Sequence, residues 1–149
     1  MIDLTSDDRF MKEAFKEANL ALEKNEVPVG AIVTHGKTII SRAHNQVELL
    51  KDPTAHAEML AITSASNSLG NQRLTDCTIY ITLEPCLMCA GAIFWSKIGR
   101  VVFGAYDNKK GFNNISSQIL PKGVEVLGGV MEDECGTIVK NFFESKRLN

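Results

Sequence analysis

Short runs of β-branched residues that alternate with segments of helical length constrain the fold of this chain most strongly. Thr78–Leu83 is rich in β-branched residues and predicts a central strand. Segments of about 10–15 residues with helical patterning lie between the predicted strands, and connections of this length are typical of crossovers. We therefore expect an α/β fold, a three-layer α/β/α sandwich whose sheet is parallel at least in part.

Apolar periodicity, capping residues and turn formers predict the individual elements. A first helix is expected to be capped by Ser6 or Asp7 and to end near Asn25. Its apolar face comprises Phe10, Met11, Ala14, Phe15, Ala18, Ala21 and Leu22. The later elements are strands at Val27–Thr34 and Lys37–Ala43 around a turn at His35-Gly36, an irregular segment at Asn45–Pro53, a helix from Asp52-Pro53-Thr54 to Leu69-Gly70, a helix from Pro85 to about Lys97, strands at Arg100–Gly104 and Val124–Leu127, and a last helix that opens at Glu132.

Length and charge exclude several classes of protein. The 149 residues contain no repeat or linker, so we expect one domain over residues 1–149. No run approaches the roughly 20 apolar residues of a membrane span. The acidic N-terminus lacks the apolar core of a secretory signal. A net charge of −2 excludes a strongly basic chain, although a local basic patch is compatible with it.

The four cysteines indicate metal or redox chemistry rather than a disulfide scaffold. Without an export signal we expect a cytoplasmic, reducing environment, in which disulfides are rare. Cys86 and Cys89 are spaced as a Cys-x-x-Cys pair, which is typical of a redox pair or a metal site. Cys77 and Cys135 are expected to be small buried apolar residues.

Two short motifs carry candidate metal ligands, and each lies at the start of a predicted helix. Thr54–Glu58 contains His56, and Glu84–Cys89 contains Cys86 and Cys89. Imidazole and thiolate are preferred zinc ligands, and a helix N-terminus lowers the pKa of a cysteine. Three protein ligands leave the fourth tetrahedral position open to water, whose pKa then falls to about 7. This arrangement predicts a catalytic zinc site.

Glu58 lies two residues beyond His56, close enough to move protons without binding the metal. His-x-Glu followed by Pro-Cys-x-x-Cys is the arrangement of zinc nucleobase deaminases. A structural zinc site is the main alternative, and it requires a fourth ligand. The candidates for that ligand are His35, His44, Cys77 and Cys135.

At these motifs the sequence resembles the cytidine deaminase superfamily, and within it the bacterial tRNA adenosine deaminases. The resemblance covers nearly the whole chain. It rests on Glu26–Ala31, Asn45, Asp52–Glu58, Thr82–Cys86, Met88–Ala92, Ile98–Ala105, Glu134-Cys135 and Phe142-Phe143.

The resemblance implies a mixed five-stranded sheet flanked by helices and a homodimer with active sites near the interface. It implies one Zn²⁺ per subunit on His56, Cys86 and Cys89, with Glu58 as the proton shuttle. Further residues that it assigns to the substrate are Asn45 at the edge of the target base and Val29 and the Ala57 backbone along its pocket. Asn45 as a loop cap and Val29 as plain core remain the alternatives.

The reaction implied is hydrolytic deamination of adenosine to inosine at the wobble position of a tRNA anticodon. Glu58 would protonate the ring N1 and then the departing amine. A base in such a pocket must be splayed out of its stack, which costs least in a single-stranded loop. A zinc-dependent deaminase of free guanine or cytosine, or of their nucleosides, is the alternative.

Charges and aromatic residues indicate where RNA would lie. Between Lys97 and Lys110 the local charge is +3. By resemblance, the RNA path is bordered by Asp107, Lys109 and the end of the last helix, with Phe142, Lys146 and Arg147. One of Phe142 and Phe143 is expected to be core. The sequence departs from many relatives at Gly111–Ser116 and Pro121–Gly123, both outside the expected zinc ligands.

Overall fold

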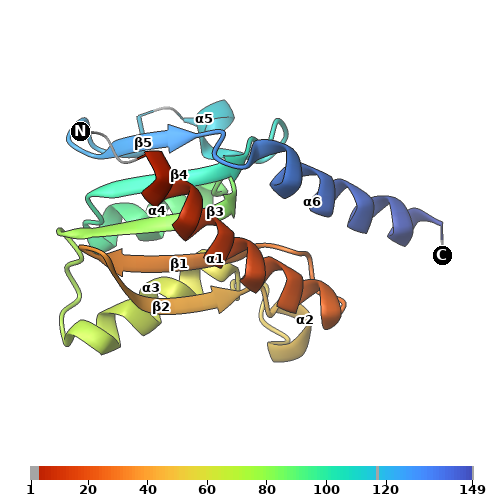
Figure 1. The fold of residues 1–149 in the computed structure, drawn as a ribbon, viewed down its shortest axis with the longest axis horizontal. Helices are drawn as coiled ribbons and strands as arrows, with labels where there is room; N and C mark the ends of the chain where they lie inside the picture. The colour runs from red at the N-terminus through yellow and green to blue at the C-terminus, as the bar shows by residue number, and fades with distance from the viewer. Residues whose placement is uncertain (1–3, 117, 149) are drawn as a thin grey trace.

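The computed structural model describes residues 4–116 and 118–148, which form a sheet between two layers of helices (Figure 1). The long helices are α1 (Leu4–Glu23), α3 (Ala57–Leu69), α4 (Leu87–Ser96) and α6 (Glu132–Arg147), with single-turn helices α2 (Val47–Leu50) and α5 (Phe112–Ile115). The strands are β1 (Gly30–His35), β2 (Thr38–His44), β3 (Cys77–Leu83), β4 (Arg100–Ala105) and β5 (Glu125–Gly128). Among the described residues, no helix is long and apolar enough to cross a bilayer.

The sheet is mixed, with strand order β2-β1-β3-β4-β5. The β1–β2 hairpin is antiparallel, and β1 also pairs antiparallel with β3. β3, β4 and β5 run parallel to one another, and the crossover from β3 to β4 passes through α4. The predicted α/β class and the mixed five-stranded sheet are confirmed.

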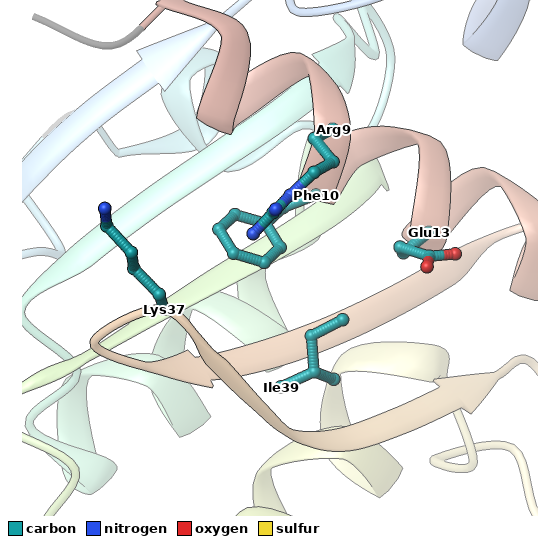
Figure 2. Close-up of a pocket in the computed structure, with 5 residues that line it drawn as sticks. All are labelled: Arg9, Phe10, Glu13, Lys37 and Ile39. Carbon is teal, nitrogen blue, oxygen red and sulfur yellow. The ribbon is translucent and has the colours of Figure 1, made fainter.

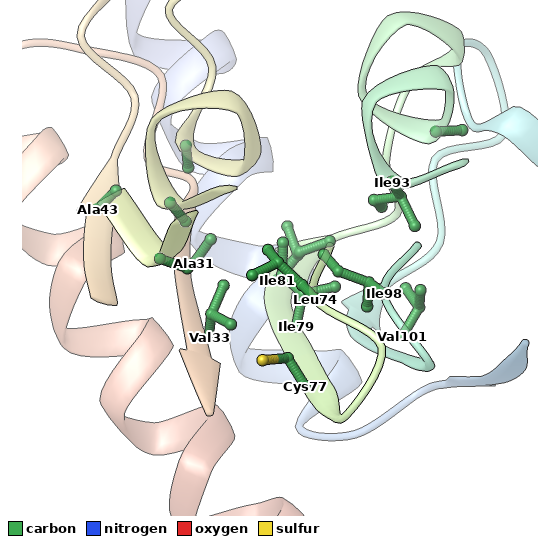
Figure 3. Close-up of a cluster of buried hydrophobic side chains, with 14 of the residues drawn as sticks. Ala31, Val33, Ala43, Leu74, Cys77, Ile79, Ile81, Ile93, Ile98 and Val101 are labelled. Atoms are coloured by element: carbon green, nitrogen blue, oxygen red, sulfur yellow. The ribbon is translucent and has the colours of Figure 1, made fainter. Parts of the chain in front are cut away.

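Alternate residues of the central strands point into two separate cores, because the side-chain period of a strand is two. Ile32 and Tyr80 pack with α1 and α6 on one face of the sheet. Their neighbours Val33 and Ile79 pack on the opposite face, beneath α3 and α4. Figure 3 shows this second cluster, in which strand residues meet Leu74 and apolar side chains from α4 and the turn that follows it.

The first helix begins earlier than the sequence indicated. Ser6 and Asp7, predicted at its N-terminal boundary, lie inside α1. The Asp7 carboxylate accepts hydrogen bonds from the Tyr80 hydroxyl at 2.8 Å and from the Arg100 guanidinium at 2.7 and 2.8 Å. This bidentate pair ties α1 to β3 and β4, a tertiary contact that a local capping pattern cannot reveal. Leu22, assigned to the buried face, is 40% exposed.

Several element boundaries also differ from the prediction. β1 begins at Gly30 and not at Val27, because Pro28 has no N–H to pair and the Val29 N–H bonds the Val27 carbonyl at 2.8 Å. α3 begins at Ala57, because the Asp52 carboxylate accepts both the N–H and the hydroxyl of Thr54 in a separate turn.

A further boundary concerns the start of α4. Pro85 stands outside the helix, and Cys86 occupies the N-cap position with extended backbone angles. The predicted irregular segment after Asn45 contains α2, and the last strand begins one residue late, at Glu125. The hairpin turn falls on Gly36-Lys37, where Gly36 has a φ of 62°.

Candidate active site

The candidate site lies at one edge of the sheet, where β2, β3 and β4 end and β1 begins. Register brings these ends together, since Gly30 pairs with His44, and Leu83 pairs with Ala105. α3 and α4 begin at the same edge, so their N-termini converge there. In α/β sheets this edge is the usual place for a ligand site.

His56, Cys86 and Cys89 gather at this edge with the geometry of metal ligands. His56 is the N-cap of α3 and Cys86 the N-cap of α4, and neither makes a side-chain capping bond. The Nδ1 atom of His56 lies 3.7 Å from the Cys86 Sγ and 3.5 Å from the Cys89 Sγ. The S–N edge of a tetrahedral zinc site is about 3.6 Å, from bond lengths of about 2.3 Å and 2.05 Å. The three groups therefore fit one zinc ion through Nδ1 and two sulfurs.

Among the protein groups alone, the pKa values of the two thiols are shifted in opposite directions. The hydrogen bond from Cys89 lowers the pKa of Cys86 to about 4, with a further contribution from His56. The same hydrogen bond, together with burial, raises the pKa of Cys89. Contact with Cys86 also raises the pKa of His56, while the positive charge of Lys110 acts in the opposite direction. A zinc site requires both sulfurs as thiolates, and a bound cation would stabilise the negative charge of both.

Glu58 points into the same site from the first turn of α3. It is buried, and burial raises the pKa of its carboxyl group. A hydrogen bond to Cys89 acts in the opposite direction and shows that the carboxyl lies against the ligand cluster. A carboxyl group that is easily protonated and adjacent to the metal position can both accept and return a proton.

A cavity of about 1110 Å³ opens beside this cluster. Its floor carries Glu58, His56 and Cys86, and its walls come from the loops after β2 and β4 and from α6. Most predicted site residues line it: Val29, Asn45, His56, Ala57, Glu58, Cys86, Asp107, Lys109, Lys146 and Arg147. Cys89 lies outside this set because its side chain is fully buried behind the cavity wall.

Asn45 combines the two functions that the sequence left open. Its Nδ2 donates to the Val27 carbonyl and its Oδ1 accepts the Val47 N–H, both at 3.3 Å. The side chain thus bridges the start of β1 and the loop after β2 while it lines the cavity. Val29 is 8% exposed and belongs to a core cluster as well as to the cavity wall.

The residues predicted to border RNA divide into two groups. Lys109, Lys110, Lys140, Lys146 and Arg147 are exposed along the cavity rim. Lys97 and Arg100 flank the opposite end of β4 from the lysines, so the basic cluster in the sequence does not form one patch. Phe142 is only 8% exposed and is absent from the cavity lining, whereas its neighbour Phe143 is 44% exposed and lines it.

The four candidate fourth ligands lie away from the cluster. His35 ends β1 at the opposite edge of the sheet, and Cys77 begins β3 there. His44 bonds Glu17 through Nδ1 at 3.1 Å. Cys77 and Cys135 are buried free thiols, as expected. Within the described residues, one group of three or more His, Cys, Asp or Glu side chains could hold a metal ion, and it consists of His56, Cys86 and Cys89.

Two buried carboxylates shape the site and were not identified from the sequence. Glu26 accepts the Glu48 and Leu49 N–H groups at 2.9 and 2.8 Å, which fixes the loop that follows Asn45. Glu84 accepts two N–H groups of the loop after β4. Burial of a charged residue type was the signal to seek, but a single sequence does not reveal burial.

A second hollow, of about 290 Å³, lies between α1 and the β1–β2 hairpin (Figure 2). Its lining includes Phe10 and Ile39, with the Arg9 guanidinium 4.7 Å from the centre of the Phe10 ring. Its described lining contains none of the predicted site residues. The larger cavity is therefore the candidate active site.

Comparison with known proteins gives one family and several near relatives. Residues 4–105 match the cytidine and deoxycytidylate deaminase zinc-binding region. A tRNA-specific adenosine deaminase of Bacillus subtilis is 46% identical over 97% of this chain and 92% of its own length. One from Aquifex aeolicus is also 46% identical, over 94% and 95%.

Solved structures agree with these sequence relatives. A structure from a study of A-to-I editing by tRNA:A34 deaminases superimposes with a TM-score of 0.81 at 39% identity, over 87% of this chain and 98% of that one. A guanine deaminase of Bacillus subtilis superimposes with a TM-score of 0.64 at 38% identity, over 66% of this chain and 64% of that one.

Proposed function

The chain belongs to the cytidine and deoxycytidylate deaminase family, and from that premise we propose that it deaminates adenosine to inosine at the wobble position of a tRNA anticodon. The observation that carries this proposal is the convergence of His56, Cys86 and Cys89 with buried Glu58 on the floor of a cavity whose rim is basic. The near relatives of full length are named tRNA-specific adenosine deaminases, and the similar solved structure at 39% identity comes from a study of A-to-I editing at the wobble position of transfer RNA.

One zinc ion per subunit fits the three ligands, because both S–N distances match a tetrahedral edge. Zinc bound to these three ligands would lower the pKa of a coordinated water to about 7 and would so supply a nucleophile at neutral pH. Glu58 accepts the proton released from the water and delivers it to N1 of adenine. Once the water oxygen has bonded to C6, Glu58 takes the remaining proton of that oxygen and delivers it to the amine, so that the C6–N bond breaks and ammonia leaves.

The remaining walls select and orient the substrate. Val29 and Ala57 give the base an apolar surface, and the amide of Asn45 can hydrogen-bond its edge. Phe143, Lys146 and Arg147 combine an aromatic face with positive charge, which suits stacked bases and phosphates of a single-stranded loop. The reducing cytoplasm is the proposed location, since all four thiols are free in the structure.

The proposal is tested by comparing an anticodon stem-loop that contains adenosine with free guanine, cytosine and their nucleosides. We expect kcat/KM for the stem-loop to be higher by about 100-fold, because two stacked bases at about 1.4 kcal/mol each would contribute about 2.8 kcal/mol. Inosine formation and ammonia release are both measured. Faster turnover of a free base would replace this proposal with the alternative below.

Guanine deamination is the second candidate, favoured by the 38% identity to the guanine deaminase of Bacillus subtilis over two-thirds of the chain. The superposition with that guanine deaminase does not cover the remaining third of this chain. A free base needs the cavity floor but not the five cations along the rim. Turnover that is insensitive to removal of these cations would favour guanine.

We also propose that the protein is a homodimer that associates through α4. Leu87, Gly91 and Trp95 fall on one face of this helix, and Leu87 is 42% and Trp95 77% exposed. Gly91 leaves open space where a side chain would stand, so another helix can approach closely. A second copy is the occupant that the family resemblance implies. Because Leu87 follows Cys86, each active site would lie within one helical turn of the interface.

Trp95→Lys should convert the dimer to a monomer, because it replaces the most exposed apolar side chain of the proposed interface by a charged one. Sedimentation velocity measures the change in mass. Leu49→Lys is the matched control, since Leu49 is 62% exposed on α2, away from α4, and should leave the mass unchanged. A wild-type protein that sediments as a monomer at micromolar concentration would contradict the proposal.

A further inference from the structure

The loop of residues 106–113 carries two cations of the cavity rim and is held by one buried carboxylate. Lys109 and Lys110 are exposed and line the cavity. The Glu84 side chain is buried, and it accepts the Asp107 N–H at 3.0 Å and the Asn113 N–H at 3.2 Å. These two amides bracket the lysines, so one side chain fixes both ends of the segment that presents them.

Inside the loop, the Asp107 side chain repeats this pattern. Its Oδ1 accepts the N–H groups of Lys109 and Lys110, each at 3.0 Å. Its main-chain carbonyl accepts the Gly111 N–H at 3.0 Å and the Asn114 side-chain amide at 2.9 Å. The Asp107 carboxylate is thus engaged with the backbone that carries the two lysines.

The loop is also attached to the turn that carries the metal ligands. Glu84 precedes Cys86 by two residues, and the Phe112 N–H donates to the Pro85 carbonyl at 2.9 Å. Gly111 forms a single bridge with Cys86, and a Cβ atom at Gly111 would overlap the Glu84 carboxyl group. The segment that departs from many relatives therefore packs directly against the ligand turn.

Resting on the proposed function, we propose that Glu84 is a positioning residue for RNA binding, which fixes the loop so that Lys109 and Lys110 both contact phosphate. Asp107 belongs to the same device and acts through the lysine backbone, not through its own contact with ribose or base. Neither carboxylate takes part in the chemistry. Their effect is on the number of phosphate contacts, which a salt titration counts.

The test measures binding of an anticodon stem-loop against salt concentration, in a Glu58→Ala background so that the RNA is not turned over. Each phosphate contact with a single strand contributes about 0.7 to the slope of log K against log salt. Replacing Lys109 and Lys110 by alanine should therefore lower the slope by about 1.4. Glu84→Gln should lower it equally, and should lower it no further when combined with the lysine replacements.

Glu26→Gln is the matched control. Glu26 is as buried as Glu84 and accepts two backbone N–H groups of the single-turn helix α2. This variant should keep the wild-type slope. An equal loss of slope in Glu26→Gln, or an additive loss when Glu84→Gln joins the lysine replacements, overturns the proposal.

Two further variants keep the proposal testable if Glu84→Gln does not fold with full zinc content. Gly111→Ala keeps the Glu84 carboxylate but adds a Cβ atom that would overlap it, so the carboxylate must move. This variant should lower the slope in the same way. Asp107→Ala changes a half-buried side chain, and should also lower the slope. A weaker affinity of Asp107→Ala at unchanged slope would show direct contact with the RNA and would overturn the proposal. If replacing Lys109 and Lys110 by alanine leaves the salt slope at its wild-type value, the result would instead contradict the RNA path of the proposed function.

Discussion

Glu58→Ala is expected to abolish turnover while the protein keeps its zinc. The substitution removes the group that moves both protons but none of the three metal ligands. General acid–base catalysis contributes about 10²- to 10⁴-fold, so the rate of inosine formation should fall by at least that factor. Metal content is measured on the same purified sample by elemental analysis.

Glu58→Gln is the control for shape. It fills the same buried space and can form hydrogen bonds, but it cannot take up and return a proton. Both variants should therefore show the same loss of rate with unchanged RNA binding. Deamination at the wild-type rate by either variant would disprove the assignment of Glu58.

Cys86→Ser should produce the second large effect, the loss of metal and with it of activity. A serine hydroxyl stays protonated at neutral pH, whereas zinc requires a thiolate. Loss of a group that only supports a zinc ligand costs about 10–100-fold in affinity, so loss of a ligand should cost at least about 100-fold. Added zinc should raise the melting temperature of the wild-type apoprotein but not that of the variant.

Cys135→Ala separates metal binding from the general effect of losing a buried thiol. Cys135 is fully buried against β4, so this variant should also lose stability. It should nevertheless retain one zinc per chain. A full complement of zinc in purified Cys86→Ser would contradict ligation by Cys86.

Much of the fold follows from local pattern. The alternation of Ile79 and Tyr80 between two cores explains why Thr78–Leu83 was recognisable as a central strand, and the apolar period of α1 identified that helix. Boundaries failed where a tertiary partner decided them. Asp7 resembles a helix cap in the sequence, but it pairs with Arg100, 93 positions away.

The proposed zinc ligands and the proposed proton shuttle were identifiable because their chemistry needs particular residue types at fixed spacing. The residues that orient the surrounding loops were not. Glu26 and Glu84 act by accepting backbone N–H groups. Because every residue other than proline has such a group, no pattern of side chains in the sequence predicts these contacts. The single-turn helix α2 escaped prediction for the same reason, since the carboxylate of Glu26 holds its first amides.

All of the cavity walls described above leave the sheet at one edge, and this gives the two ends of the strands different tolerance to change. At the far edge, the turns at Gly36-Lys37 and Gly70-Asn71 are built on glycines with positive φ, and a Cβ atom at either glycine would have no described neighbour within 4 Å. Inserted segments or a fused protein should be accommodated there without altering the cavity. New domains could thus be added at the edge of the sheet opposite the cavity. Substrate range could be varied independently through the loops at the cavity edge.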